Sequence, residues 1–238
     1  MIDKIRKDFI SYYKTFDFRK ERILYKFHHS FRVMEYSKEI AESLNLNNSD
    51  IELSTVIGLL HDIARFKQWT IYETFVDRDS FDHGDEGVNI LKELDILDYD
   101  DETKNIIYTA IKNHNKYEIK VSNEREELFS KIIRDADKID IMKEVRRDFE
   151  KLDYSINEKV VEDFLNNKLV DSTYVNNPME ANVRTMSFIY DINYKYSIEF
   201  IKKHNIIDNS LNLLKLYCNN EELVEKLEKH IYKYIEER

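Results

Sequence analysis

Glycine, proline and cysteine are scarce in this sequence. Its 238 residues include Gly 3, Pro 1 and Cys 1. So few glycines leave little room for turns that need a positive φ, and the chain is dense in Ile, Leu, Lys, Glu and Asn, so we predict an all-α protein. The single cysteine, Cys218, excludes an intramolecular disulfide. The length suffices to bury a substantial core.

The sequence also lacks long apolar runs and an excess of basic charge. Its longest apolar runs, such as residues 56–60, fall far short of the about 20 residues that span a bilayer. The first residues are charged and contain no signal-peptide core, so we expect a cytoplasmic location and no membrane partner. The net charge of -10 opposes non-specific binding to nucleic acid. A bound dication and a few basic side chains can still hold a small anionic substrate in one cleft.

Amphipathic patterns run along the whole chain. We expect residues 1–145 to form the domain that carries the chemistry, and residues 146–238 to be a C-terminal helical extension packed on it in the same globule. The extension shows no chemical motif, P-loop or zinc-finger spacing. Its predicted helices cover residues 157–165, 179–203, 209–218 and 220–235.

The stretch 59–65, Leu-Leu-His-Asp-Ile-Ala-Arg, places a histidine directly before an aspartate at the end of an apolar helical run. The imidazole nitrogen of His61 and the carboxylate of Asp62 suit a divalent transition metal. We expect this helix to begin at a capping box of Ser49 and Glu52. A buried, ionised Asp62 needs a metal, an arginine or several donors nearby. Taken alone, the pair is more often a buried histidine beside a helix-end carboxylate.

Other candidate ligands lie on separate predicted helices. His29 and Arg32 share a helix face, although a lone histidine there is usually structural and Arg32 usually a surface charge. Asp82 can cap a helix that holds His83 in its first turn, where the helix dipole keeps the imidazole neutral. Judged from this segment alone, an exposed first-turn histidine is an equal alternative for His83. His114 is expected at the end of another helix. We predict that residues 68–81 form a loop that covers the site.

The run 134–140, Arg-Asp-Ala-Asp-Lys-Ile-Asp, supplies a further carboxylate on a predicted helix over residues 124–142. Asp137 and Asp140 lie about one turn apart, whereas Asp135 points elsewhere. We therefore expect Asp135 to face solvent or to pair with a basic side chain.

The order and local context of these residues resemble the HD-domain superfamily of metal-dependent phosphohydrolases over about residues 25–145. The matching segments are His29-Ser30-Phe31-Arg32-Val33, Leu60-His61-Asp62-Ile63-Ala64-Arg65, Asp82-His83-Gly84 and Asp135-Ala136-Asp137-Lys138-Ile139-Asp140. They are specific as a set, and none is specific alone. The resemblance implies an HD-type helical bundle.

The resemblance also implies a ligand set. A first metal would be bound by His29, His61, Asp62 and Asp137, and a second by His83 and His114, with Asp62 as the bridge. The cofactor would be one or two divalent transition ions, drawn from Mn, Fe, Co, Ni and Zn, with Mg as a further candidate. Two dications about 3.5 to 4 Å apart can hold a hydroxide as the nucleophile. The implied reaction is hydrolysis of a phosphoester in a small nucleotide-like substrate.

The expected partner is thus a small phosphorylated metabolite or nucleotide, and oligomerisation is left open. Asp62 and Arg65 are the expected catalytic residues, with Arg32, Arg65 and Lys116 contacting phosphate. The segment Ala64-Arg65-Phe66-Lys67 is basic, whereas relatives that act on guanosine tetraphosphate or nucleoside monophosphates tend to carry a carboxylate here. It looks closer to the His-Asp-Ile-Gly-Lys form associated with phosphodiesterases, so the choice between phosphodiesterase and phosphatase stays open.

Two alternative functions also stay open. HD-fold proteins with a similar ligand set can hold a di-iron centre that activates oxygen, and ligand identity alone does not separate iron from manganese. The second alternative is a non-catalytic module that binds a nucleotide or metal and signals through the C-terminal helices.

Overall fold

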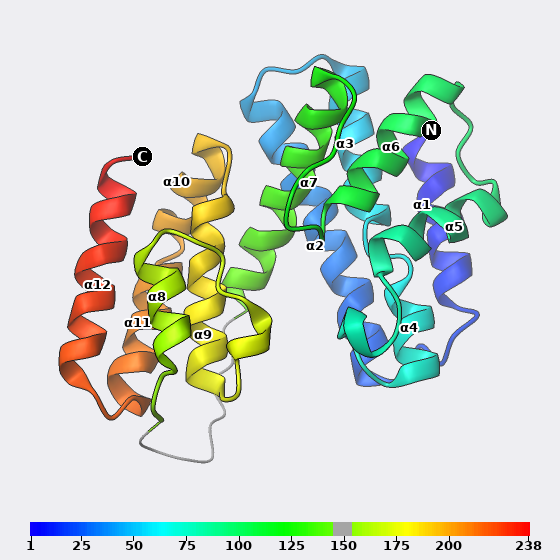
Figure 1. The fold of residues 1–238 in the computed structure, drawn as a ribbon. Helices are drawn as coiled ribbons and strands as arrows, with labels where there is room; N and C mark the ends of the chain where they lie inside the picture. Colours follow the sequence, from blue (N-terminus) through cyan, green and yellow to red (C-terminus); the bar gives the residue numbers. More distant parts are fainter. Residues whose placement is uncertain (145–153) are drawn as a thin grey trace. The chain divides into compact units, whose positions relative to one another are not determined.

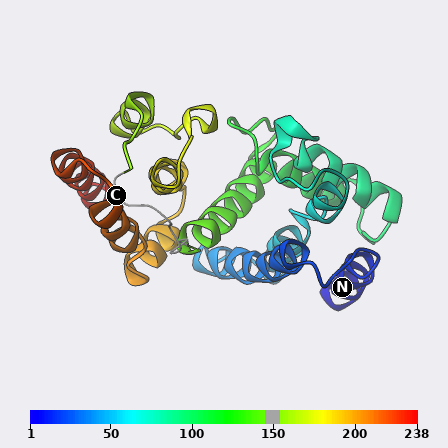
Figure 2. The ribbon, with the colours of Figure 1, turned by 90° about the horizontal axis from the view of Figure 1, so that it is seen from below.

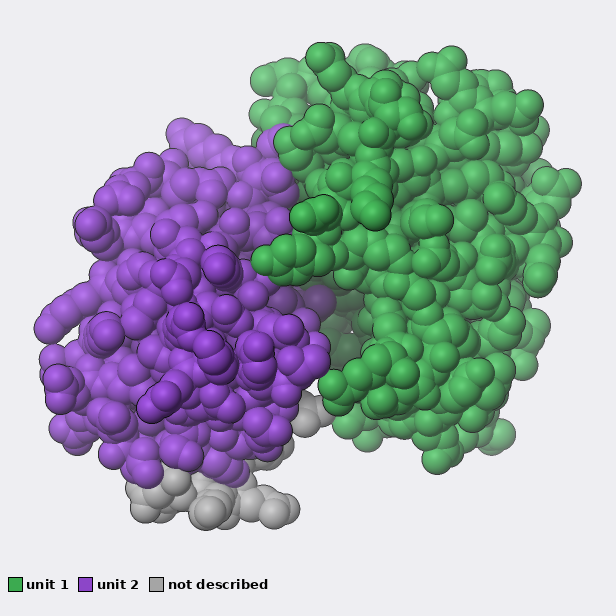
Figure 3. All heavy atoms as spheres, in the orientation of Figure 1, with its two compact units in different colours: residues 1–137 green, residues 138–238 purple. Residues whose placement is uncertain are grey.

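The structure, a computed structural model, describes residues 1–144 and 154–238. Helices make up the regular structure of these residues, apart from an isolated bridge between Tyr154 and Cys218, so the prediction of an all-α fold is confirmed. The chain divides into two compact units, Met1–Asp137 and Lys138–Arg238, which Figure 3 colours separately. The boundary expected between residues 145 and 146 lies outside the described residues. No described helix has both the length and the apolar character needed to cross a membrane.

Unit 1 contains the predicted site residues. In chain order its elements are α1 Ile2–Tyr13, α2 Glu21–Ser43, α3 Asn48–Leu60, α4 Arg65–Tyr72, the 3-10 turn η1 Asp77–Asp79, α5 His83–Leu94, α6 Asp101–Asn113 and most of α7 Glu124–Lys143 (Figure 1). Helix α3 is buried on nearly every side, since the side chains from Leu53 to Leu60 are all buried. Aromatic rings join α1 to α2 and α4, with centroids 4.1 Å apart for Tyr13 and Phe27 and 5.7 Å apart for Phe9 and Phe66.

Helices α2 and α3 pack very closely, and Gly58 permits this. A Cβ atom built on Gly58 would lie 2.9 Å from the Cα of Met34 and 2.9 Å from the carbonyl oxygen of Val33. Because both neighbours are backbone atoms of α2, they cannot yield as a side chain would. The close approach brings His29 of α2 toward His61, which follows α3 directly. The helix α7, which Figure 2 shows at an angle to α2, brings Asp137 to 3.1 Å from His29.

The other two glycines lie where α5 meets α6. A Cβ on Gly84 would lie 3.0 Å from the carbonyl oxygen of Ile111, and one on Gly87 would lie 3.4 Å from the Cγ2 atom of Ile111. This contact places His83, the first residue of α5, beside His114 at the end of α6. No glycine has a positive φ; in the described residues that conformation is adopted by Asn45, Glu73, Asp95, Asn167 and Asn205.

Some element boundaries differ from the predictions. The N-cap of α3 is Asn47, whose side chain accepts a hydrogen bond from the Asp50 amide, so Ser49 does not cap the helix. Asparagine satisfies the free amides of a helix start as well as serine does, and the sequence offered both. Residues 68–81 are not one loop, because α4 extends to Tyr72 and η1 follows. The caps expected at Asp82 and Asp100 are confirmed.

Unit 2 is also helical. It continues α7 from Lys138 and contains α8 Glu158–Leu165, η2 Ser172–Tyr174, α9 Pro178–Ser187, η3 Phe188–Asp191, α10 Lys195–Lys203, α11 Ile206–Tyr217 and α12 Glu221–Glu236. The prediction of a single helix over residues 179–203 is wrong. Helix α9 ends at Ser187, η3 ends at Asp191, and α10 begins only at Lys195. There the Asp191 carboxylate binds the Lys138 ammonium at 2.7 Å, and the Asn193 side chain donates to the Asp191 carbonyl at 3.0 Å. These side-chain bonds compete with helical ones.

We expect the substitution Gly58→Ala to lower the free energy of unfolding by about 1–3 kcal/mol, because the added methyl group must push α2 and α3 apart. This loss would appear although alanine favours a helix by about 1 kcal/mol over glycine. Urea denaturation followed by circular dichroism measures it. Gly87→Ala is the matched control, since its nearest heavy atom is 3.4 Å away. Equal stability of the two variants would contradict the role of Gly58.

Candidate metal centre

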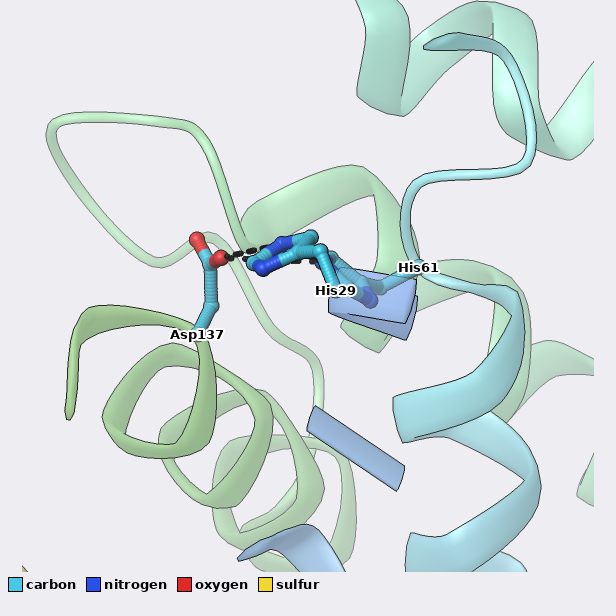
Figure 4. Close-up of side chains that lie close together, drawn as sticks. All are labelled: His29, His61 and Asp137. Atoms are coloured by element: carbon cyan, nitrogen blue, oxygen red, sulfur yellow. Dashed lines mark hydrogen bonds and ion pairs between the residues drawn. The ribbon is translucent and has the colours of Figure 1, made fainter. Parts of the chain in front are cut away.

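Four donor atoms from α2, the segment after α3 and α7 converge inside unit 1. The Nε2 atom of His29 lies 3.2 Å from Nε2 of His61, 3.4 Å from Oδ2 of Asp62 and 3.1 Å from Oδ1 of Asp137. The Nε2 atom of His61 lies 3.6 Å from each of the same two oxygens. Figure 4 shows the two imidazole rings and the Asp137 carboxylate pointing toward one another.

These spacings fit a single ion. Histidine nitrogens and carboxylate oxygens bind zinc-like metals at about 2.0–2.2 Å, so neighbouring ligand atoms of one ion lie roughly 3.0–3.6 Å apart. Each of the measured separations falls in that interval. Three of the four ligand residues are withdrawn from water, since both histidines are fully buried and Asp62 is 2% exposed, whereas the Asp137 side chain is 15% exposed.

A second group of donors uses the other oxygen of Asp62. Its Oδ1 atom lies 3.5 Å from Nε2 of His83 and 3.6 Å from Nε2 of His114, and these two nitrogens are 2.9 Å apart. Asp62 therefore presents one carboxylate oxygen to each group. His61 also stands between them, since it lies within 4.8 Å of donors in both groups.

The far nitrogens of two of these histidines show which nitrogen carries the proton. Nδ1 of His61 lies 2.8 Å from the Gly58 carbonyl, and Nδ1 of His114 lies 2.6 Å from the Ile111 carbonyl. A carbonyl only accepts, so both Nδ1 atoms donate. In a neutral ring the Nε2 atom is then an unprotonated acceptor. Acceptor nitrogens that face each other need a cation between them, and a divalent metal meets that need.

The electrostatics keep the donors in the protonation states that bind metals. Burial lowers the pKa of His61, and burial together with the Arg65 charge lowers the pKa of His83 to about 3. Burial alone would raise the pKa of Asp62, but the charges of Lys26, His61 and Arg65 hold that pKa well below its ordinary value. The pKa of Asp137 is likewise low, because contacts with His29 and His61 outweigh its burial. Neutral imidazoles and ionised carboxylates are the forms that coordinate.

Comparison with known families agrees with this arrangement. The family model for the HD domain matches residues 27–142, a range that contains all of these donors. Residues 27–142 of the chain belong to the HD-domain superfamily. Members of this superfamily are generally metal-dependent phosphohydrolases, and the resemblance inferred from the sequence is confirmed. No curated protein and no solved structure gives a significant match to the chain.

Sequence reasoning missed a carboxylate of the HD domain that orients His83. The Oδ2 atom of Asp77, in η1, lies 2.6 Å from Nδ1 of His83. Its Oδ1 atom accepts from Arg65 at 3.2 Å and Gln68 at 3.0 Å, and Asn115 donates to Oδ2 at 3.0 Å. With its pKa held low by His83 and Arg65 against the effect of burial, Asp77 accepts the Nδ1 proton of His83. The only signal in the sequence was its place in the charged run Asp77-Arg78-Asp79.

Arg134 is a second residue that the sequence did not single out. Its side chain is 1% exposed, and its Nη1 atom donates to the carbonyl oxygens of Asn113, at 2.9 Å, and of Lys116. These are carbonyls at and beyond the end of α6, which a cation can satisfy. Arg134 lies one turn before Asp137 on α7, so it ties the segment of His114 to the helix of Asp137.

The three residues predicted to bind phosphate lie at different distances from the donor atoms and have different partners. Arg65 is nearest the donors, with its Nε atom 3.3 Å from Oδ1 of Asp62. Lys116 bonds to Asp82 and, at 2.9 Å, to Asp85 at the start of α5. Arg32 lies over the ring of Tyr25 at 6.0 Å, and that ring stacks on His29 with centroids 6.3 Å apart.

The ligand set that the resemblance implies leaves out two other aspartates of α7, Asp135 and Asp140. Asp135 and Asp140 are both 0% exposed. The expectation that Asp135 faces solvent is therefore wrong, because α7 is covered on that side as well as on the side of Asp137. Pairing of Asp135 with a basic side chain stays a prediction.

We expect Asp77→Asn to weaken binding at the His83 and His114 group by about 10–100-fold, the usual effect of losing a carboxylate that orients a metal-binding histidine. The first metal, held by the His29 and His61 group, should bind with unchanged affinity. Titration with Mn²⁺ followed by calorimetry separates the two events. Asp79→Asn is the control, because Asp79 is exposed and, among the described residues, forms an ion pair with Arg78 alone, at 3.5 Å. Equal affinities in both variants would contradict the role of Asp77.

The metal-free protein should lose stability as the pH falls below 6.5. The pKa of His83 drops from 6.5 to about 3 on folding, so between these values the unfolded chain binds a proton that the folded chain does not. His61 acts with the same sign because its pKa is also lowered. Urea denaturation at several pH values, in the presence of a chelator, measures this slope. His83→Gln should flatten it, and an unchanged slope would contradict the pKa of His83.

Proposed function

We propose that this HD domain hydrolyses a phosphoester bond in a small nucleotide-like substrate with the help of two divalent ions. The observation that carries the proposal is the position of Asp62, whose Oδ2 and Oδ1 atoms face separate groups of histidine nitrogens. A carboxylate in this position can bridge two metals. Membership of a superfamily of metal-dependent phosphohydrolases supports the same reaction.

In this proposal, the first ion is held by His29, His61, Asp62 and Asp137, and the second by Asp62, His83 and His114. When bound, such ions lower the pKa of a water molecule to make a nucleophile and neutralise charge on the phosphoryl oxygens. The protein keeps its imidazoles neutral and its carboxylates ionised, so it need not release protons from these groups at neutral pH. The donors contain nitrogen and oxygen only, which suits Mn, Fe, Co, Ni or Zn.

Arg65 is the proposed phosphate contact closest to these donors. Its Nη1 atom is occupied by Gln68 at 2.6 Å, the Phe75 carbonyl at 2.7 Å and Asp77 at 3.2 Å. These bonds fix the guanidinium plane, while no residue in the described part of the chain accepts from its Nη2 atom. That atom can donate to a phosphoryl oxygen. Lys116 and Arg32 are proposed as more distant contacts.

We expect Asp62→Ala to lose both bound ions and to reduce phosphoester hydrolysis by at least about a thousandfold, since one residue serves both metal groups. Elemental analysis of the purified protein and a panel of phosphomonoesters and phosphodiesters measure the two effects, and circular dichroism checks that the helices persist. Asp17→Ala, which removes an exposed carboxylate that pairs with Arg19 at 3.7 Å, is the control.

Different outcomes separate the alternatives. Two retained ions in Asp62→Ala would contradict the bridging role. Two iron ions in the wild-type protein, with oxygen consumption and no hydrolysis across the panel, would replace the proposal with a di-iron oxygenase. A nucleotide recovered intact after incubation with the metal-loaded protein would favour a binding module.

A further inference from the structure

Lys26 is a buried cation that no part of the proposed ligand set explains. It lies on α2 three residues before His29, so the two side chains share a helix face. Its side chain is only 11% exposed, and its Nζ atom donates to Oδ2 of Asp62 at 2.7 Å. That oxygen is the one that faces His29 and His61. Lys26 therefore binds the same carboxylate oxygen that is proposed to coordinate the first metal.

The ammonium group of Lys26 has hydrogen-bonding capacity to spare. A lysine carries three N–H donors and no acceptor. Asp62 is the one hydrogen-bond acceptor that the described residues provide for Nζ, and the other neighbour is the face of the Phe75 ring, 5.4 Å from Nζ to the centroid. An aromatic face attracts a cation but does not replace a strong acceptor. A buried ammonium group whose N–H donors are not all bonded is stabilised by an additional anionic acceptor.

Arg65 approaches the same place from the other side. Its Nε atom binds Oδ1 of Asp62 at 3.3 Å, and its guanidinium carbon lies 5.6 Å from the centroid of the Phe75 ring. Lys26 and Arg65 thus share both Asp62 and Phe75 as neighbours. Arg65 also pairs with Asp77 at 3.2 Å, so in the metal-free protein the two cations are matched by the carboxylates of Asp62 and Asp77. Once two dications bind, the positive charge of the ions, Lys26 and Arg65 exceeds the negative charge of Asp62, Asp77 and Asp137, and an anion can neutralise the excess.

A third cation, Arg22, and a second aromatic ring, Trp69, extend this arrangement. Arg22 lies one turn before Lys26 on α2, with its guanidinium carbon 5.8 Å from the centroid of the Trp69 ring. Trp69 contacts Phe75 at 5.0 Å between centroids. Arg22 is exposed, whereas Lys26 is buried. This basic and aromatic series leads from the surface to Asp62 in a protein whose net charge is -10, and it can draw an anion toward the site.

We infer that Lys26 is a substrate-binding residue whose ammonium group, together with Nη2 of Arg65, binds the phosphoryl group of the substrate when the metals are bound to Asp62. The inference rests on the proposed function and adds a residue to it. In the metal-free protein Lys26 neutralises Asp62. With metal bound, Asp62 is neutralised by the ion, and Lys26 turns its free donors to the phosphoryl oxygens.

The test uses the full-length protein loaded with Mn²⁺ and inorganic phosphate as the probe. Lys26→Met removes the charge but keeps a side chain that can pack on Phe75, and Lys26→Gln keeps a donor for Asp62. Elemental analysis gives the Mn²⁺ content, and calorimetry gives the dissociation constant for phosphate. We expect both variants to retain Mn²⁺ and to bind phosphate about 10–100-fold more weakly, the usual effect of losing a charge-assisted hydrogen bond. Lys67→Met, which removes a lysine paired with Glu86 at 2.5 Å, should bind as the wild type does.

Phosphate binding within twofold of wild type in variants that retain Mn²⁺ would overturn the inference and leave Lys26 as a partner of Asp62 alone. Loss of Mn²⁺ from both variants would overturn it too, because Lys26 would then build the metal site. These results are distinguishable from failure of the proposed function, which appears as an absence of hydrolysis by the wild-type protein. For a phosphoester that the wild type does hydrolyse, an unchanged KM in Lys26→Gln would also overturn the inference.

Discussion

The carboxylate of Asp62 is the point on which unit 1 depends. It is almost fully buried, and burying an ionised carboxylate is costly unless cations and hydrogen bonds surround it. The surrounding groups come from several helices: Lys26 and His29 from α2, Arg65 from α4, His83 from α5 and His114 from the end of α6. A shift of any one of these helices would leave a charge or a polar atom without its partner. The helices are thus held in register by electrostatics as well as by the apolar core.

The three glycines show how the helices come close enough for this. Gly58 lets α3 approach the backbone of α2, while Gly84 and Gly87 let α5 approach the end of α6. The first contact joins His29 to His61 and the second joins His83 to His114, so each pair of facing imidazoles depends on a small residue at a helix crossing. The glycines of this protein allow close helix packing, whereas the residues with a positive φ are asparagine, aspartate and glutamate. Scarcity of glycine was therefore a sound sign of a helical fold but not of a scarcity of such turns.

The local features of the site were accessible from the sequence because they depend on neighbouring residues. The helix caps at Asp82 and Asp100, the buried run before His61 and the position of His83 at a helix start follow from side-chain chemistry within a few residues. The break near Asp191 did not, because its carboxylate is held by Lys138 from a distant part of the chain. The burial of Asp135 also depends on packing around α7 that periodicity alone does not report.

By itself the sequence determined the helical class, the HD-type order of histidines and aspartates, and the chemical type of donor each could offer. Only the tertiary structure decided which atoms meet: that the two oxygens of Asp62 face different histidine pairs, that Asp77 holds His83, and that Lys26 and Arg65 share Asp62 and Phe75. The physical reason is range. Capping and amphipathic burial act over a few residues, whereas hydrogen bonds and charges at the site join residues far apart in the chain, and their geometry exists only after the helices have packed.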